Sequence, residues 1–569
     1  MSTANRSRGP IPLGAKPLAA RNRRVTTLRP VPNAFRLPAR PGGPIVPRMS
    51  SSGRLIRSTG VIAVCTFLSR ILGLVREIAF GYFFSTSGLL SAFRIAFMLP
   101  NLARRLFGEG ALSAAMIPVL TRTLADRGEL ESRRFIGALL TWLTVVVTLL
   151  IAAIEIVLLL GQTLSPDPSW TLAAVILPYM LLICLVAVIG GVLNVRGHFA
   201  IPAAAPALLN LSILAAVIIG AVTLRLSEGA LMYVVCAGVL VGGLIQLAAV
   251  AWALRRVAFI PIFGGALRDP QLRRVINLMG PMALGLSALQ INSLMDYLIA
   301  YLFIFHDGER IGPAVLGYAQ VLYQLPLGVF GIALATAIFP LLSAKAADDD
   351  RAGVANVLAR GIRLSLFIAL PASIGLMFVA RPLVATLLQH GRFDAGDTQR
   401  VAGALLFYAA GLAAYFTQHL FARTFYALHD SATPARIAGC IVALNFTLNL
   451  ILVFPLQERG LALATAITAT LQVIWLALRL TTRLREIPWP EIARGAFRTA
   501  AAAAAMTTVL ASLTLTPLAE SWQTAPALAR LLVLIAAGAG AYTVASLGLN
   551  LHELRSALAE RGRTDGRAS

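Results

Sequence analysis

The chain has 569 residues, of which 58% are hydrophobic and 13% are charged, and its formal net charge is +24. Soluble domains are about 45–50% apolar and about 25% charged, so this composition excludes an ordinary soluble protein and indicates a polytopic membrane protein. Lys16 and nine arginines lie in the first 48 residues without any acid, and the remaining positive charge is concentrated in alternate loops, so we expect no nucleic-acid partner.

Residues 1–52 form a basic arm rich in proline and arginine that contains no apolar segment. We expect this arm to be disordered, because it cannot bury an apolar core. Two interpretations stay open: the arm tethers the chain to anionic lipids, or translation really starts at Met49. Four cysteines stand in or beside apolar runs without CxxC spacing, which favours neither disulfides nor a zinc site.

Fourteen apolar runs follow, each long enough to cross about 30 Å of hydrocarbon. They span residues 57–84, 87–122, 133–161, 169–195, 201–224, 229–255, 273–305, 312–343, 354–388, 397–428, 434–456, 459–484, 494–517 and 524–551. We therefore predict an all-α polytopic membrane protein with about 14 transmembrane helices in two bundles around a central basic cavity.

The runs group into an N-terminal bundle at 53–260, a second bundle at 270–430, C-terminal spans at 431–552 and a tail at 553–569. Arginine-rich loops alternate with loops such as GQTLSPDPSW and TPLAESWQ, which contain neither Lys nor Arg. Because cytoplasmic loops carry the excess of basic residues, both termini and the tail are predicted to be cytoplasmic.

Five arginines interrupt the first two apolar runs: Arg70, Arg76, Arg94, Arg104 and Arg105. A charge at the bilayer centre costs between about 3 and 17 kcal/mol, so such a residue has to face protein, water or an anionic ligand. A guanidinium matches phosphate geometry better than an ammonium does, and phosphate is the expected cargo group. The alternative for Arg104 and Arg105 is that they cap a kinked helix or anchor its cytoplasmic end.

Several segments resemble the MurJ (MviN) family, the lipid II flippases of the multidrug/oligosaccharidyl-lipid/polysaccharide exporter superfamily. They are SRILGLVRE (69–77), AFRIAFMLPNLARRLFGEGALSAAMIPVL (92–120), LPLGVFGIALATAIFPLLS (325–343), LLQHGRFDAGDTQ (387–399) and FARTFYALHDSATP (421–434).

The resemblance implies a transporter, not an enzyme. It would move lipid II, the undecaprenyl-pyrophosphate-linked disaccharide pentapeptide, from the inner to the outer leaflet of the bacterial cytoplasmic (inner) membrane by alternating access. The family's cavity arginines fall on Arg70, Arg76 and Arg104, with Arg105 and Glu109 beside them. Glu109 is expected to pair with one of the arginines.

The sequence departs from the family pattern at three positions. Ser91 replaces a common acid of the second span, Val321 replaces an arginine of the eighth, and Glu77 is a mild change after Arg76. Arg94 is an additional positive charge that would compensate for the lost arginine if it faces inward.

A second polar group concerns coupling. Asp296 is a lone carboxylate in span seven, and Asn445 and Asn449 share one face of span eleven because they are four residues apart. With Thr465 and the carbonyl of Leu461 they resemble a sodium site found in some family members. The alternative is a protonated Asp296 hydrogen-bonded between helices, which desolvation favours. No cofactor is required; a sodium ion or the membrane potential would supply the coupling.

The chain contains no Walker A, HExxH or GxSxG motif and no long extramembrane loop, which argues against a glycosyltransferase. Two rival functions stay open: a flippase for another polyprenyl-linked oligosaccharide of the O-antigen kind, and a non-transporting scaffold for cell-wall synthesis. The expected partners are lipid II, membrane lipids and cell-wall synthesis proteins.

Overall fold

The computed structural model describes residues 51–105, 111–165, 167–264, 269–484, 486–515 and 525–549. Residues Leu55–Ser569 form one compact unit, distinct from Met1–Arg54. Almost all of the predicted arm and the whole predicted tail lie outside the described residues. Our predictions for those two segments therefore stay predictions.

The first half of the described chain is helical. Its elements are α1 (Ser51–Phe84), α2 (Gly88–Ala103), α3 (Ala111–Leu164), α4 (Pro168–Ile176), α5 (Tyr179–Val195), α6 (Ala200–Ile218), the π-helical turn η2 (Ile219–Thr223) and α7 (Glu228–Arg256).

The second half is helical apart from a short hairpin. Its elements are α8 (Pro270–Phe303), β1 (Phe305–His306), β2 (Glu309–Arg310), α9 (Gly312–Pro326), η3 (Leu327–Gly331), α10 (Ile332–Ala347), α11 (Arg351–Leu388), α12 (Ala395–Ala410), α13 (Leu412–Ala427), α14 (Ala432–Leu456), α15 (Glu458–Arg483), α16 (Trp489–Leu515) and α18 (Ala527–Gly548). The hairpin is antiparallel and pairs Phe305 with Arg310.

Many of these helices suit a bilayer. Among the described residues, ten are long and apolar enough to cross a membrane, or eleven if the pair α12 and α13, bent by 44°, is one span. The all-α membrane architecture is therefore confirmed. That set does not include α1, α2 and α8, so the number fourteen stays a prediction.

Three breaks in the predicted helical segments occur at or next to a proline or a glycine. Pro178 separates α4 from α5, and Pro326 is followed directly by the π-helical turn η3, because proline removes an intrahelical hydrogen bond. Gly128 has a φ of 81° and interrupts α3 between two of the predicted spans. Proline and glycine therefore account for these three breaks.

Helices from the first half pack on one another through small residues. A Cβ atom at Gly238 of α7 would lie 2.5 Å from Cβ of Ala216 in α6, so glycine lets the two helices approach closely. Such small-residue contacts are typical of membrane helices, which associate by packing. α5 lies between α3 and α7 and contacts both.

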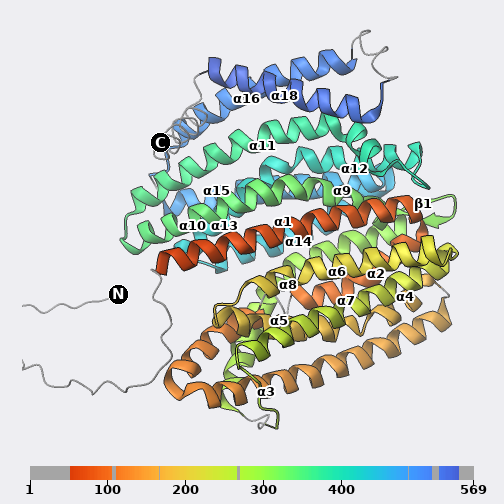
Figure 1. Cartoon of the computed structure of the whole chain (residues 1–569). Coiled ribbons are helices and arrows are strands. Elements are labelled where there is room, and N and C mark those ends of the chain that lie inside the picture. Colours follow the sequence, from red (N-terminus) through yellow and green to blue (C-terminus); the bar gives the residue numbers. More distant parts are fainter. Residues whose placement is uncertain are drawn as a thin grey trace, which may run out of the picture. The chain divides into compact units, whose positions relative to one another are not determined.

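Helices from the second half assemble around α11 and α15. α14 and α15 pack on each other; α14 also packs on α8, and α15 also packs on α12 and α13. α16 and α18 pack against α11 (Figure 1). Val379, Met506, Leu510, Leu531 and Leu534 form the apolar contact between α11, α16 and α18. The last two helices are thus attached through α11.

Gly137 on α3 provides a test of the packing. A Cβ atom there would lie 1.9 Å from the carbonyl oxygen of Ile262, a backbone atom that cannot swing aside. We expect Gly137→Ala to lower the thermal unfolding temperature of the purified protein by several degrees, because overpacking typically costs about 1–3 kcal/mol. Gly439→Ala is the control, since a Cβ atom at Gly439 meets nothing within 4 Å. Equal unfolding temperatures for both variants would contradict this packing.

Candidate functional site

A buried charge cluster joins α1 to α2. The carboxylate of Glu77 is 2% exposed and binds two guanidiniums, Nη2 of Arg76 at 2.6 Å and Nη2 of Arg94 at 2.6 Å. Removing either arginine would leave a buried carboxylate poorly compensated, which is costly in a low-dielectric interior. With two cations and one anion, the cluster keeps one net positive charge.

Neighbouring helices hold both arginines in place. Arg76 donates from Nη1 to Oδ1 of Asn210 on α6 at 3.0 Å, and the Arg94 guanidinium lies 4.7 Å from the ring centre of Tyr318 on α9. A Cβ atom at Gly317 would lie 2.1 Å from Nη1 of Arg94, so glycine makes room for this side chain. The Nε atoms of both arginines are buried and have no hydrogen-bond partner among the described residues. Two buried N–H donors thus lack a partner within the described part of the chain.

The cluster lines a cavity of about 200 Å³ between α1, α2, α8 and α9, which we call the small cavity. Arg105 enters it from the end of α2 and donates from Nη1 to Oε1 of Gln290 on α8 at 2.7 Å. Tyr297, Gln320 and Gln324 contribute further polar groups. The small cavity therefore combines three guanidiniums with one carboxylate.

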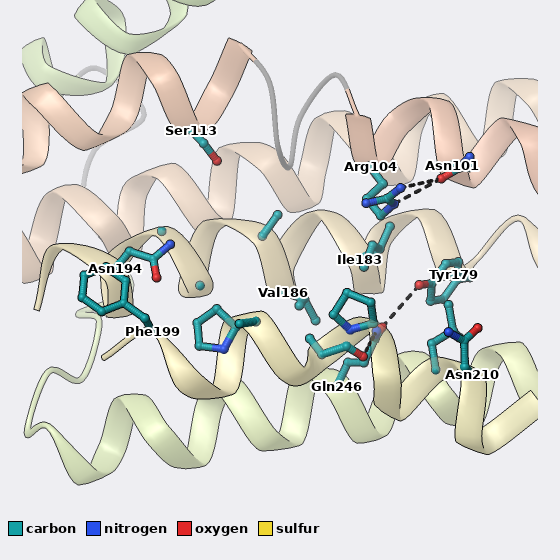
Figure 2. Close-up of a pocket in the computed structure, with 18 of the residues that line it drawn as sticks. Asn101, Arg104, Ser113, Tyr179, Ile183, Val186, Asn194, Phe199, Asn210 and Gln246 are labelled. Carbon is teal, nitrogen blue, oxygen red and sulfur yellow. Dashed lines mark hydrogen bonds between the residues drawn. The ribbon is translucent and has the colours of Figure 1, made fainter. Parts of the chain in front are cut away.

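A second cavity, the large cavity, has a volume of about 660 Å³ and lies between α2, α3, α5, α6 and α7. Arg76 and Arg104 line it, and Arg104 donates from Nε and Nη2 to Oδ1 of Asn101 at 3.1 and 2.9 Å (Figure 2). Arg104 thus points into this cavity and is held by a residue of its own helix.

The remaining predicted residues are placed differently. Arg70 lies outside both cavities and donates from Nη1 to the carbonyl of Gln324 at 3.3 Å, against η3. Ser91 is buried and accepts a hydrogen bond from the backbone of Ala314 at 3.2 Å, so it joins α2 to α9. Glu109 lies outside the described residues. Any contact of Arg70 or Glu109 with a cargo stays a prediction.

The predicted cation ligands come together in part. Asp296 on α8 is 4% exposed, and its Oδ1 accepts a hydrogen bond from the Asn449 amide at 2.6 Å. The same amide donates to Oδ1 of Asn445 at 2.9 Å, and Asn445 donates to the hydroxyl of Thr468 at 3.1 Å.

The last two predicted ligands pair with each other. The Thr465 hydroxyl donates to the Leu461 carbonyl of its own helix at 3.0 Å. The described residues contain no cluster of three or more His, Cys, Asp or Glu side chains. Any cation at Asp296 would therefore rely on one carboxylate and neutral oxygens.

The structure brings to the cavities several side chains that the sequence does not single out. Glu77 stands out in the sequence only as a mild change, although a carboxylate directly after an intramembrane arginine is by default functional. The amides of Asn101, Gln290 and Asn210 accept hydrogen bonds from arginines. An amide in an apolar run is a weak indication of a functional site, because such amides also form hydrogen bonds that only hold helices together.

Polar contacts tie the two halves of the chain together at the end of α1 that lies near β1 (Figure 1). Ser85 and Thr86 donate to the carboxylate of Asp397 on α12, and Arg392 pairs with Glu228 of α7. Glu309 of β2 accepts from the backbone N–H of Gly88 at 2.8 Å. The large cavity reaches toward the opposite end, where Asn194 lies in the last turn of α5.

Asp167, the N-cap of α4, adds to these polar contacts. It accepts from Tyr301 of α8 and lies 3.6 Å from Nε of Arg310. Partial burial alone would raise the pKa of Asp167, but hydrogen bonds from Tyr301 and Ser169, together with the charge of Arg310, hold the pKa below its usual value. The carboxylate is therefore charged and paired at neutral pH.

Known proteins resemble this chain in sequence and in fold. A family model described as lipid II flippase MurJ matches residues 80–536. The lipid II flippase MurJ of Burkholderia cenocepacia is 32% identical over 446 residues, covering 75% of this chain and 84% of that protein. A probable lipid II flippase MurJ of Vibrio cholerae is 32% identical and covers 74% of this chain and 82% of its own length.

Two solved structures share the fold. One, a lipid II flippase MurJ in an inward closed conformation, has a TM-score of 0.71 at 23% identity and covers 85% of this chain and 97% of its own. An inward-facing multidrug resistance MATE family transporter of the MOP superfamily has a TM-score of 0.62 at 16% identity; the match covers 75% of this chain and 99% of that one. With the sequence matches over most of its length, the chain belongs to the lipid II flippase MurJ family.

Proposed function

We propose that this protein is a lipid II flippase, a transporter that makes and breaks no covalent bond. Its cargo is the polyprenyl-pyrophosphate-linked peptidoglycan precursor, carried from the inner to the outer leaflet of the bacterial cytoplasmic membrane. Membership of the family supports this proposal. The observation that carries the mechanism is the buried cluster of Arg76, Glu77 and Arg94, which keeps a net positive charge beside a cavity.

The arginines suit a pyrophosphate. The Nε donors of Arg76 and Arg94 have no partner among the described residues, and phosphate oxygens accept bidentate hydrogen bonds from guanidiniums. Arg105 and Arg104 bring further positive charge to the two cavities that meet at Arg76. Glu77 offsets part of this charge, so the site attracts an anion without binding it irreversibly.

Alternating access accounts for movement of the headgroup. The contacts of Asp397 with Ser85 and Thr86 close one end, and the large cavity extends toward the other. We assign the closed end to the periplasm because the loops at the opposite end carry the basic clusters. We count α1, α2 and α8 as three further spans, which with the bent pair taken as one span gives the proposed total of fourteen.

Coupling to an ion or to the membrane potential completes the proposal. Moving one charge across the membrane is worth about 2.3 kcal/mol per 100 mV, enough to bias one conformational step. Asp296 adjoins Tyr297, which lines the small cavity, so a change of charge at Asp296 would act close to the cargo.

A second cargo is favoured by one observation. Ser91 serves as a hydrogen-bond acceptor between α2 and α9 and carries no charge, which differs from the family pattern. A flippase for another polyprenyl-linked oligosaccharide would use the same arginines for its pyrophosphate. Rescue of a lipid II flippase depletion strain distinguishes the two cargoes.

Arg76→Ala and Arg104→Ala test the anion site. We expect neither variant to support growth of a bacterium whose own lipid II flippase is shut off, although the wild-type chain does. Hydrogen bonds to charged groups contribute about 1.5–3 kcal/mol, so cargo affinity falls by more than about tenfold. Arg134→Ala is the control, because Arg134 is exposed and pairs only with Glu131 three residues away. Normal growth on either cavity variant at wild-type abundance would refute this site.

Cysteines at Ser85 and Asp397 test alternating access. In the double variant Ser85→Cys and Asp397→Cys, a short thiol-reactive cross-linker should lock the closed end and stop exposure of lipid II at the outer leaflet. A reducible linker should restore exposure after reduction. Each single variant treated in the same way controls for modification alone. Full exposure of lipid II by the cross-linked protein would contradict the mechanism.

Asp296→Asn tests the coupling site. The Asn449 amide can still donate to an amide oxygen at position 296, so we expect the variant to fold normally but to flip at the same rate in sodium as in potassium, because it has no charge to change. Flipping is measured with labelled lipid II in proteoliposomes, with sodium or potassium outside. If the wild type flips faster in sodium and Asp296→Asn loses that stimulation, a sodium ion binds at Asp296.

A further inference from the structure

A third recess lies on the second half of the chain and shares no lining residue with the small or the large cavity. Its volume is about 380 Å³, and residues of α11, α12 and the first turn of α15 line it. Because α12 packs against both α11 and α15, the three helices form one continuous wall (Figure 1). We call this space the α12 recess.

Apolar side chains make up most of the α12 recess. The largest of them are Met377 and Phe378 of α11 and Leu406 and Phe407 of α12. Leu406 is 37% exposed, so the recess opens on the outside of the helices. α11, α15 and the bent pair of α12 and α13 are each long and apolar enough to cross a membrane, so this opening faces lipid. Such a surface suits an acyl chain.

Two arginines interrupt this apolar lining. Arg381 of α11 is exposed, and Arg459 of α15 is half-buried. Neither guanidinium has a hydrogen bond, an ion pair or a ring contact with any residue that the structure describes. The described residues that line the recess include no carboxylate. The α12 recess therefore carries two positive charges without a counter-charge in its described lining.

Gly403 of α12 holds Arg459 beside the apolar lining. A Cβ atom at Gly403 would lie 2.5 Å from Nε and 3.1 Å from Cζ of Arg459, so only glycine makes room for this guanidinium. An arginine at a membrane surface ordinarily extends its charged head into water. Arg459 instead lies against α12, which places its N–H donors next to the acyl-chain surface.

Both arginines lie near one end of the helices. Arg381 is seven residues before Leu388, the last residue of α11, which is about 10 Å along a helix that rises about 1.5 Å per residue. Gln457, the N-cap of α15, accepts a hydrogen bond from Arg400, and Arg400 also contacts His306 of β1. The recess thus lies toward the closed end, which we assign to the periplasm, and it faces the outer leaflet.

We propose that the α12 recess binds an anionic phospholipid of the outer leaflet, which is a resident lipid and not the cargo. Its phosphate accepts hydrogen bonds from Arg381 and Arg459, whose planar guanidiniums match phosphate oxygens. One acyl chain lies along Phe378 and Phe407. Two uncompensated positive charges favour phosphatidylglycerol, which has a net negative charge, over the zwitterionic phosphatidylethanolamine. The bound lipid joins α11, α12 and α15.

Binding of three lipids tests the α12 recess. Purified full-length protein is delipidated and titrated separately with phosphatidylglycerol, phosphatidylethanolamine and undecaprenyl phosphate, and bound lipids are counted by native mass spectrometry. We expect the wild type to bind phosphatidylglycerol most tightly. The double variant Arg381→Gln with Arg459→Gln should bind it at least about tenfold more weakly, because it loses hydrogen bonds to a charged group. Gly403→Ala keeps both charges but displaces Arg459, and should also weaken binding.

The double variant Arg436→Gln with Arg479→Gln is the matched control. Both arginines are exposed, neither lines the α12 recess, and the change in net charge is the same. We expect this control to bind phosphatidylglycerol as the wild type does. Because a ligand that binds only the folded state stabilises it, phosphatidylglycerol should raise the unfolding temperature of the wild type and of the control. It should leave that of the Arg381→Gln, Arg459→Gln variant unchanged, and the unfolding transition without lipid shows that this variant is folded.

Three results would overturn the proposal. Equal binding of phosphatidylglycerol by the wild type and by both recess variants removes the site. Equal wild-type affinities for phosphatidylglycerol and phosphatidylethanolamine remove the preference for an anionic headgroup. Tighter binding of undecaprenyl phosphate than of phosphatidylglycerol, lost in the recess variants, gives the recess to a polyprenyl phosphate. The assay contains no lipid II, so any of these results leaves the proposed function standing.

Discussion

The pairing of Glu77 with Arg76 and Arg94 is the interaction on which the other features of the site depend. Three charges within apolar helices are tolerated because the carboxylate touches both guanidiniums at 2.6 Å. This pairing fixes the end of α1 against α2 and, through Tyr318, against α9. The Nε donors of both arginines stay buried without a hydrogen-bond partner in the part of the chain that the structure describes.

The cluster also relates the cavities to the closed end. Arg76 lies two turns before the end of α1, and the next residues, Ser85 and Thr86, bind Asp397 of α12. In the proposed mechanism, a cargo bound at Arg76 acts on α1, whose end makes the contacts with Asp397. The proposal thus connects cargo binding to these contacts through one helix.

Periodicity and apolar length are enough to predict most of the fold from the sequence, because a span of hydrocarbon sets the length of a helix. The arginines of the first two spans are also predictable, since intramembrane charge is costly. Their partners are not. The sequence does not show which carboxylate, Glu77 or Glu109, pairs with the arginines. It also does not show that Gly317 makes room for Arg94, because both contacts depend on how helices distant in the sequence approach each other.

Release of a pyrophosphate imposes the final constraint. An array of guanidiniums alone would bind a dianion too tightly to let it go, whereas a flippase has to bind and discharge its cargo in each cycle. Glu77 shares both arginines with any anion, so binding of phosphate competes with an ion pair that already exists. In the proposed cycle, Glu77 takes the guanidiniums back when the helices rearrange. The proposal therefore needs the buried carboxylate for release as much as it needs the arginines for binding.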